Sequence, residues 1–571
     1  MQSLKLSPEM WPNDESKGLL AAQHLARTAA GHAEGMHGAV TVAYGGWAAR
    51  AGLEALKQGG NAIDAAMTTA MAQIVLTSGA PVSFFGIQSL VYYEARTGRV
   101  HCMNAEWNTV LGEHDPRSIP GGYDVSSTEG LRGKGAPSGR TAMVGGFLKG
   151  VEAAHRRFGS LPFSALFEPS IYLAEHGVPI TAAHAGYIDL RSADLARLAA
   201  TAEIFKKSDG ADYREGDTFR QPALARTLRT VAAAGTDHLY QGPWAQKLVQ
   251  AVQADGGHMT LEDLARYEVL WRNALVAQVG DHELHTSPLP NAGGVALVEA
   301  LNLARAARLH ESPHWGSSAE SLKTAVTIAQ MIFLDYLPAE VREAVYPGVD
   351  LSPSARLTTE HAQKLWDLMA QGRLPFRFVD AAPRHSDDVV AIDREGNIAA
   401  ITHSSNTVMW GKTCINIDGI SIPDAAAHQQ AQMARIRPGD RLPAPTETGI
   451  LFKQGRPVLG FASMGSGLHH RSLQALLNVT AHGMSVREAI DAPDFFNSII
   501  DPETHALTLS VPARRFPQEV LQATGWAFRE LDSEHARFGG EGLWVAISRD
   551  PATRQLQAAS HNRNNSAAFA Y

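Results

Sequence analysis

Apolar and polar residues follow two different patterns along the chain, and the change comes near residue 380. From Gly46 to about Ala80, apolar and small residues recur at helical spacing, with a break at the turn 58–61. Residues 145–345 follow the same period for most of their length. Helices are predicted there at 151–158, 165–176, 223–234, 245–256 and 321–339. Beyond Asp380, short alternating segments predict strands, so a helical block is followed by a strand-rich block.

Three pairs of alternating segments predict antiparallel hairpins. The pairs are 89–94 with 100–104, 389–393 with 398–402, and 450–452 with 458–461. Each pair is joined by a short stretch that contains glycine, which supplies the positive φ that tight turns require. An antiparallel sheet is therefore expected to begin in the first hairpin, with further hairpins after residue 380.

The second hairpin brings polar residues together at one end. If 395–396 are its two loop residues, Ser386 lies opposite Ser405. Ser404 and Asn406 are then the diagonal neighbours of Ser386, within reach of a hydrogen bond. This pairing predicts that three polar side chains converge where the strand begins.

A glycine-rich turn follows the third hairpin. Ser463-Met464-Gly465-Ser466-Gly467 leads into a helix predicted at 469–482. Backbone N–H groups at such a strand-to-helix turn can bind developing negative charge, so Gly465 and Ser466 are candidates for an oxyanion site. A phosphate-binding role is disfavoured because no Gly-Lys-Ser/Thr follows. His469 and His470 are interpreted as structural, since adjacent helical residues point about 100° apart.

Composition and charge narrow the class of partner. The 571 residues contain 50 Lys and Arg against 58 Asp and Glu, a formal net charge of -8 without basic blocks. This balance argues against nucleic acid or an anionic membrane as the main partner and favours a small-molecule substrate. Cys102 and Cys414 are too few for a disulfide framework or a zinc cage and are interpreted as buried apolar residues.

Two segments bear on membranes and targeting. The run 62–80 is rich in small and apolar residues but contains Asp64 and Gln73, so it is predicted to be a buried core helix and not a membrane span. Residues 1–18 have no apolar stretch of the kind found in a secretory signal. A cytoplasmic location is therefore expected.

Six segments, in the same order, resemble γ-glutamyltranspeptidase, a family of N-terminal-nucleophile (Ntn) hydrolases. They are GGNAIDAA at 59–66, FGSLPFSALFEPSIYLAEHGVPIT at 158–181, GDTFRQPALARTL at 216–228, LYQG at 239–242, GGHMTLEDLARYE at 256–268 and PNAGG at 290–294. The resemblance runs from about residue 39 to 500. It implies an α+β fold, the four-layer αββα sandwich in which two antiparallel sheets are flanked by helices.

The resemblance also implies a cleavage site and a nucleophile. Precursors of the family cut themselves before a threonine that opens a strand ending in an Asp-x-x-Gly-Asn turn, and the matching turn here is 393–397. Counting back by the family's spacing gives Ser386, preceded by His385. Cleavage between these two residues divides the chain into an N-terminal extension (1–38), a large subunit (39–385) and a small subunit (386–571).

Serine can perform the chemistry expected of the threonine. The mechanism needs a β-hydroxyl beside a free α-amine, which titrates near ~8 and is suited to act as a general base. The resemblance implies that Ser404 and Asn406 orient Ser386, and Gly465 and Ser466 are expected to hold the oxyanion.

No metal site is predicted beside the nucleophile. His385, Asp387 and Asp388 are interpreted as an exposed turn and not as metal ligands, because nearby positions lack the spacing of a metal cage. Acyl transfer by the expected route needs no cofactor and no metal.

One departure from the family concerns substrate binding. Family members grip the substrate α-carboxylate with an Arg in a GRE segment, and the matching residues here are Ala105-Glu106-Trp107. At ~4 Å and an effective dielectric near ~20, a carboxylate in that place changes about 4 kcal/mol of attraction into a similar repulsion. Glutamyl substrates should therefore bind poorly. Glu106, Trp107 and Phe84 or Phe85 are predicted to receive a neutral or cationic acyl group instead.

Three functions remain open at this point. The leading interpretation is an autoprocessed amidase or acylase that cleaves a small-molecule amide through a Ser386 acyl-enzyme and is not glutamyl-specific. The second is a γ-glutamyltransferase or glutathione hydrolase, and the third is a non-catalytic binding protein. The expected partners are the amide substrate and the two subunits of one precursor, with no nucleic acid and no membrane. A homodimer of processed heterodimers is also compatible with the sequence.

Overall fold

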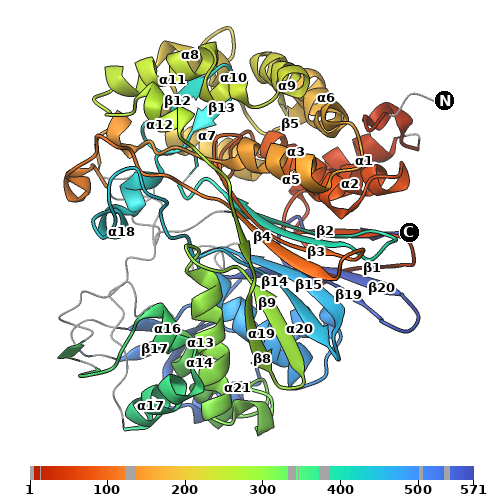
Figure 1. The fold of residues 1–571 in the computed structure, drawn as a ribbon, viewed down its shortest axis with the longest axis vertical. Coiled ribbons are helices and arrows are strands. Elements are labelled where there is room, and N and C mark those ends of the chain that lie inside the picture. Colours follow the sequence, from red (N-terminus) through yellow and green to blue (C-terminus); the bar gives the residue numbers. More distant parts are fainter. Residues whose placement is uncertain are drawn as a thin grey trace.

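Two stacked sheets with helices on both outer faces form the centre of the molecule (Figure 1). The structure is a computed structural model, and it describes residues 5–12, 14–121, 135–331, 343–344, 346–371, 386–407, 409–500, 504, 506–532 and 541–571. All strand pairs within the two large sheets are antiparallel. The predicted α+β class and its four-layer αββα arrangement are confirmed.

The first sheet, called sheet 1, takes strands from both ends and the middle of the chain. Its order is β21 (Ala567–Ala570), β2 (Ala39–Val42), β10 (Ser386–Ile392), β11 (Ile398–Ser404), β3 (Ile87–Glu94), β4 (Arg99–Ala105) and β7 (Leu270–Asn273). The first two predicted hairpins are present as β3–β4 and β10–β11. The β10–β11 hairpin lies in the middle of the sheet, between β2 and β3.

The second sheet, called sheet 2, is built in the same way. Its order is β1 (Gly31–Gly35), β20 (Leu556–Ser560), β19 (Leu543–Arg549), β15 (Arg456–Met464), β14 (Glu447–Lys453), β9 (His282–Thr286) and β8 (Leu275–Val279). The third predicted hairpin is β14–β15. Because β1 pairs with β20, sheet 2 includes part of the predicted extension 1–38.

One helical layer covers the outer face of sheet 1 (Figure 1). Its helices are α1 (Glu15–Ala21), α2 (Gly46–Lys57), α3 (Ala62–Leu76), α5 (Phe147–Phe158), α6 (Glu168–His176), α7 (Ala182–Leu195), α8 (Ala199–Phe205), α9 (Pro222–Ala234), α10 (Asp237–Tyr240), α11 (Pro243–Ala254) and α12 (Leu261–Ala265). All residues of α3 are buried, as predicted for the run 62–80. Asn61 and Asp64 form a capping box at its first turn, which satisfies backbone N–H groups that the helix leaves free.

The other helical layer covers sheet 2. It contains α13 (Gly293–Ala306), α14 (Ala319–Met331), α16 (Pro353–Arg356), α17 (Thr359–Ala370), α19 (Leu468–Thr480), α20 (Val486–Asp491) and α21 (Gln518–Ala523). Smaller sheets join β5 (Val178–Pro179) to β6 (Thr218–Phe219), β12 (Ile415–Ile417) to β13 (Ile420–Ile422), and β16 (Ile499–Ile500) to β17 (Leu507–Pro512) and β18 (Ala527–Leu531). The helix predicted at 321–339 is present as α14 as far as Met331, after which the chain leaves the described residues.

The block 145–345 is mostly helical, as predicted, but it also contains strands that were not predicted. It contributes β7, β8 and β9, which extend both sheets at one edge. The burial of β8 alternates from residue to residue, as expected for an edge strand with one face toward solvent. Because these strands are short, their apolar and polar positions are hard to recognise in a segment of the sequence that is otherwise helical.

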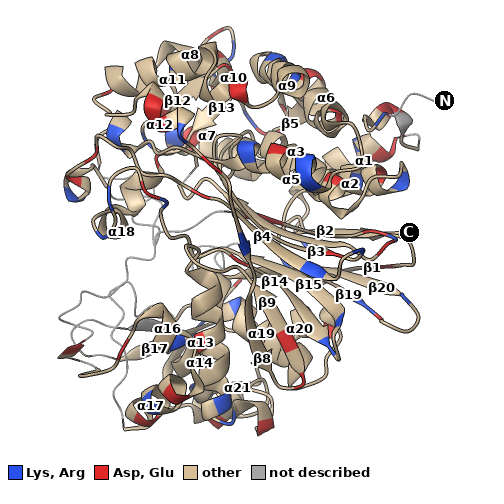
Figure 2. Ribbon diagram, viewed as in Figure 1, with Lys and Arg blue, Asp and Glu red and all other residues tan. Residues whose placement is uncertain are grey.

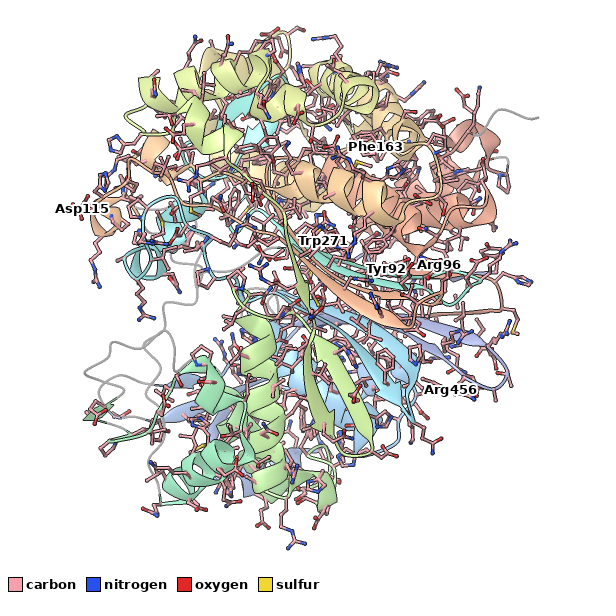
Figure 3. All side chains as sticks on the ribbon, viewed as in Figure 1. Tyr92, Arg96, Asp115, Phe163, Trp271 and Arg456 are labelled. Atoms are coloured by element: carbon pink, nitrogen blue, oxygen red, sulfur yellow. The ribbon has the colours of Figure 1, made fainter. Side chains whose placement is uncertain are left out.

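Aromatic side chains join the helical layer to sheet 1. The ring of Tyr92 on β3 lies 4.6 Å from that of Phe158 on α5, and the ring of Trp271 on β7 lies 5.6 Å from the same phenylalanine, both between centroids. Tyr92 and Trp271 lie where sheet 1 meets the helical layer (Figure 3). Contacts of this size bury large apolar areas and fix the helix against the sheet.

The two faces of β10 and β11 have different neighbours. Val390 and Ile398 lie in the apolar layer between the sheets, whereas Val389 packs toward the helices. Since successive side chains point to opposite faces, the even-numbered residues of both strands face sheet 2. A Cβ at Gly460 of β15 would lie 2.5 Å from Ile398 Cγ2, so glycine permits the close approach of the sheets there.

Charged residues lie mainly on the outer helices, with both signs interspersed (Figure 2). In this view, positive and negative residues alternate, so no extended region carries charges of one sign. Within the described ranges, no helix has the length and apolar character needed to cross a bilayer.

Candidate functional site

Ser386 opens β10 and is held by a hydroxyl on the neighbouring strand. Its Oγ donates a hydrogen bond to Ser404 Oγ at 2.9 Å, and both residues are buried, with 5% and 1% of their surface exposed. The backbone N–H of Asn406 donates to the same Ser404 Oγ, also at 2.9 Å. Ser404 therefore connects the predicted nucleophile to Asn406. His385, on the other side of the predicted cleavage point, lies outside the described residues.

The pairing of β10 with β11 differs by one residue from the prediction. Ser386 lies opposite Ser404 and not opposite Ser405. The loop contains three residues, 394–396, instead of two, because the carboxylate of Asp393 accepts two N–H groups of the chain that turns around it. The loop ends on a glycine with a φ of 90°, which is typical of three-residue hairpin loops.

The glycine-rich turn between β15 and α19 contains two backbone N–H groups that find no acceptor among the described residues. Gly467 N–H donates to the Glu541 carbonyl at 3.0 Å, and Asn497 Nδ2 donates to the Ser466 carbonyl at 3.0 Å. Within the part of the chain that the structure describes, neither the Gly465 N–H nor the Ser466 N–H donates a hydrogen bond. Two adjacent N–H groups in this state can stabilise an oxyanion.

The turn lies at the same end of the sandwich as Ser386. Thr402 Oγ1 donates to Asp388 Oδ1 at 2.7 Å and lies 3.4 Å from the Ser463 carbonyl oxygen of β15. Ser386 is two residues from Asp388 along β10, on the same face of the sheet. Gly465 is likewise two residues beyond Ser463. Nucleophile, orienting hydroxyl and backbone donors thus meet at the same end of the sandwich.

Asp387 and Asp388 are buried, contrary to their interpretation as an exposed turn. They belong to β10, with 1% and 0% of their surface exposed, because this strand is in the middle of sheet 1. Burial raises the pKa of both carboxyls well above the usual range, although hydrogen bonds such as that from Thr402 oppose the shift. Among the described residues, no group of three or more His, Cys, Asp or Glu side chains could hold a metal ion.

Glu106 is fully buried at the end of β4. Its carboxylate accepts hydrogen bonds from the hydroxyls of Ser89 and Thr446, the second at 3.0 Å. Burial raises the pKa of Glu106, against the lowering effect of these hydroxyls and of the Arg441 charge. Glu106 therefore favours its neutral form more than an exposed glutamate does. The repulsion of a substrate carboxylate predicted from the sequence is therefore too large, because that prediction assumes that Glu106 is fully ionised.

The residues that enclose Glu106 are absent from the predicted site. Asn291 Nδ2 donates to Ser89 Oγ at 3.1 Å and also to Thr446 Oγ1, and Thr446 Oγ1 lies 2.9 Å from Ser89 Oγ. Asn291 belongs to the PNAGG segment, which could have directed attention to it. Ser89 and Thr446 carry no such signal, because only the fold brings them to Glu106.

The aromatic residues predicted to contact substrate are packed in cores. Trp107 is 1% exposed and belongs to a small apolar cluster with Ile87 and Met143. Phe84 and Phe85 belong to the core on the helical side of sheet 1, a different cluster from that of Trp107. The structure therefore does not gather the four predicted substrate contacts into one apolar wall, and their role in binding stays a prediction.

The two histidines at the start of α19 are both buried, with 5% of His469 and 1% of His470 exposed. His469 Nδ1 contacts the buried carboxylate of Glu447. His470 packs its ring against Phe495, with 6.2 Å between centroids. These contacts favour the structural interpretation.

Comparison with known sequences places the chain among self-processing enzymes. A sequence model of the family described as Gamma-glutamyltranspeptidase matches residues 48–571. The "Glutathione hydrolase proenzyme" of Pseudomonas sp. (strain A14) is 25% identical over 512 residues, which cover 84% of this chain and 85% of that protein. The "Acylase ACY 1 proenzyme" of Pseudomonas sp. (strain SE83) is 28% identical over 466 residues, which cover 78% and 80%.

Comparison with solved structures supports the same fold. Cephalosporin acylase from Bacillus halodurans superposes with a TM-score of 0.74 at 21% sequence identity, and the match covers 95% of this chain and 97% of that one. At this level of identity the similarity establishes the shared architecture alone.

Proposed function

Because the chain belongs to the γ-glutamyltranspeptidase family, as the resemblance predicted, we propose that it cuts its own backbone before Ser386 and then uses that serine to hydrolyse an amide. The coarser class, an autoprocessed amide hydrolase or acyltransferase of the Ntn type, follows from the family and from relatives named as acylase and glutathione hydrolase proenzymes. One observation carries the choice of residue: Ser386 opens a buried strand and is hydrogen-bonded to Ser404, at the end of the sandwich where the Gly465 and Ser466 N–H groups have no acceptor among the described residues.

Self-cleavage creates the catalyst. Ser386 Oγ attacks the carbonyl carbon of His385, and the acyl group moves from nitrogen to oxygen. Water then hydrolyses the resulting ester and releases the carboxylate of His385 and the hydroxyl of Ser386. The nitrogen of Ser386, an amide in the precursor, is now an amine that titrates near ~8 and can accept a proton at neutral pH.

Turnover uses the same hydroxyl. The free amine takes the proton from Ser386 Oγ as the oxygen attacks the substrate carbonyl, and later passes a proton to the leaving amine. Ser404 Oγ holds the nucleophile by the hydrogen bond of 2.9 Å. The Gly465 and Ser466 N–H groups stabilise the oxyanion. Water then hydrolyses the acyl-enzyme.

The acyl group we propose lacks a carboxylate at the end that lies near Glu106. Two strands, β11 and β3, lie between β4 and the strand β10 that carries Ser386. At about 4.8 Å for each neighbouring pair, Glu106 lies roughly 14 Å across the sheet from Ser386 and faces only the far end of an acyl group bound there. Arg441, the cation that acts on Glu106, already donates to Asn104 at 2.5 Å and to Asn108 at 2.7 Å. Its guanidinium is therefore engaged by the protein and poorly placed to bind a substrate carboxylate.

Glutathione hydrolysis is the second candidate, favoured by the relatives that carry that name. The two candidates differ in the acyl group, so a pair of chromogenic anilides separates them. We expect phenylacetyl-p-nitroanilide to be hydrolysed at least about tenfold faster than γ-glutamyl-p-nitroanilide, a factor that corresponds to about 1.4 kcal/mol. Faster hydrolysis of the γ-glutamyl compound would favour the second candidate.

Ser386→Ala is the control for both anilides. This variant should hydrolyse neither compound, because it lacks the attacking oxygen. If it matched the wild type, Ser386 would not be the nucleophile. A wild-type chain that stays intact and hydrolyses neither anilide would favour a non-catalytic binding protein.

A further inference from the structure

Five buried ionisable residues form a connected network beside the glycine-rich turn. They are Arg471, Asp494, Glu541, His561 and Arg563, with side chains at most 8% exposed. They come from the first turn of α19, the segment after α20, the residues just before β19 and the segment after β20. The network therefore joins four segments that surround the turn.

Arg563 is the centre of this network. Its guanidinium donates to the two Asp494 oxygens at 2.7 and 3.3 Å, and its Nε donates to Glu541. Arg471 lies 3.5 Å from the same Asp494 carboxylate, and His561 Nε2 lies 3.6 Å from Glu541 Oε1. Burial opposes ionisation of both acids, but the neighbouring cations outweigh it and lower the pKa of each. Two arginines and two carboxylates thus balance one another.

The network reaches the glycine-rich turn through the main chain of Glu541. The carbonyl of this residue accepts the Gly467 N–H at 3.0 Å, and a Cβ at Gly465 would lie only 2.8 Å from the same oxygen. A Cβ at Gly542 would lie 2.2 Å from the Gly467 carbonyl oxygen. The turn is therefore in direct contact with the backbone that carries the Glu541 side chain. Contacts that fix the Glu541 side chain therefore also fix the glycine-rich turn.

We propose that Glu541 and Arg563 are positioning residues that keep the Gly465 and Ser466 N–H groups where the oxyanion forms. The inference rests on the proposed function, since only an enzyme that forms a tetrahedral intermediate needs this turn held. Backbone donors stabilise an oxyanion only when they are fixed in place before the reaction. A buried ion network often adds little to stability, because it is costly to remove charges from water. A role in positioning the turn explains why these charges are buried here.

A second buried network provides the matched control. Glu299 on α13 accepts from Arg356 Nε at 2.8 Å and lies 2.8 Å from His361 Nε2, and all three residues are buried. These residues lie on α13, α16 and α17 in the outer layer of sheet 2, and none belongs to the glycine-rich turn. Glu299→Gln and Glu541→Gln each remove one buried charge that faces an arginine and a histidine.

The experiment compares these two variants with the wild type. The probe is phenylmethanesulfonyl fluoride. Ser386 Oγ gives its proton to the free α-amine and bonds to the sulfur, fluoride leaves, and a sulfonyl oxygen occupies the oxyanion site whatever the natural substrate is. We expect both variants to lower the unfolding temperature, while only Glu541→Gln slows inactivation, by about 10- to 100-fold. Equal inactivation rates for the two variants would overturn the proposal.

Two further results keep the outcomes distinct. A wild-type chain that neither cleaves itself nor reacts with the probe would overturn the proposed function and not merely this inference. If Glu541→Gln does not fold, Arg563→Lys decides, because it keeps the charge but loses the paired contacts to Asp494 and Glu541. Slow inactivation in that variant supports positioning, and a wild-type rate with a lowered unfolding temperature overturns it.

Discussion

Within the described residues, the Ser386 hydroxyl makes one hydrogen bond, to Ser404 Oγ, and this bond depends on the register of two strands. Ser404 Oγ lies directly opposite, whereas Ser405 follows the strand and its N–H donates to the Pro81 carbonyl at 3.1 Å. Ser404→Ala should slow self-cleavage about tenfold, because a lost hydrogen bond of about 1.4 kcal/mol changes a rate by that factor. Ser405→Ala, which removes the neighbouring buried hydroxyl, is the control. Time courses on denaturing gels would show this, and a slower Ser405→Ala chain would contradict the register.

Burial of Asp388 should make the free energy of unfolding decrease as the pH rises. Its pKa is raised in the folded chain, so the folded state keeps a proton that the unfolded state releases above about pH 4. The stability this group contributes is present below that pH and is lost as pH rises toward the folded pKa, by up to about 1.4 kcal/mol per pH unit. Asp388→Asn does not titrate and keeps an oxygen for Thr402.

Urea unfolding at pH 5 and pH 7 tests this expectation. The measurement uses the Ser386→Ala background, which keeps the chain uncut and avoids the new amine. Unfolding free energy should fall more between the two pH values in the chain with Asp388 than in the Asp388→Asn chain. Identical slopes in both chains would show that the buried carboxyl does not hold its proton.

The residues of the site were predictable to different degrees. Ser386 came from the spacing of a family motif, and the local pattern alone would have left it as an ordinary strand-end serine. The hairpin partner was missed by one residue, because the role of Asp393 in the loop depends on its hydrogen bonds. Asn291 and Thr446 lie far from Glu106 in sequence, and only the packed fold places them there.

At the scale of single elements, the turn after β15 leaves no room for a Cβ at Gly465. Gly465 has a φ of 90°, and a Cβ there would meet the Glu541 carbonyl oxygen at 2.8 Å. Gly455, in the β14–β15 turn, has a φ of 72° with nothing within 4 Å of an added Cβ. Alanine is strained at both positions, at a cost of about 1 kcal/mol each, but it displaces backbone only at Gly465.

Gly465→Ala should therefore lower the rate of anilide hydrolysis about 10- to 100-fold, because it moves backbone donors of the oxyanion site. Gly455→Ala should lose stability alone and keep the wild-type rate. Initial rates at saturating substrate, measured beside thermal unfolding, separate the two effects. Equal loss of rate in both variants would mean that the turn acts only through stability.

Elements with strong periodic patterns were predicted well, and weak ones were missed. The three hairpins and the helices α2, α3, α5, α6, α9 and α11 lie where the apolar spacing placed them, because those patterns reflect burial on one face. Other helices, among them α7 and α13 with 14 residues each, were not predicted. β7, β8 and β9 were missed, since each has only four or five residues and lies in a segment of the chain that is rich in helices. β1 and β2 were missed for the same reason of length.

At the scale of the whole molecule, the two predicted subunits share both sheets. In sheet 1, β10 and β11 lie between β2 and β3, and in sheet 2, β14 pairs with β9 while β20 pairs with β1. Cutting the chain before Ser386 therefore leaves every strand pair intact. The two fragments should elute as one species in native gel filtration and separate only under denaturing conditions. A smaller fragment that elutes alone would contradict this arrangement.

The most direct test is the identity of the first residue of the smaller fragment. Purified wild-type protein is separated on a denaturing gel, the smaller band is sequenced from its N-terminus, and Ser386→Ala is treated in parallel. The account predicts a smaller fragment that begins with Ser386-Asp387-Asp388 and a single uncut chain for the variant. A wild-type chain that remains continuous through residues 385–386 while it hydrolyses amides would contradict it.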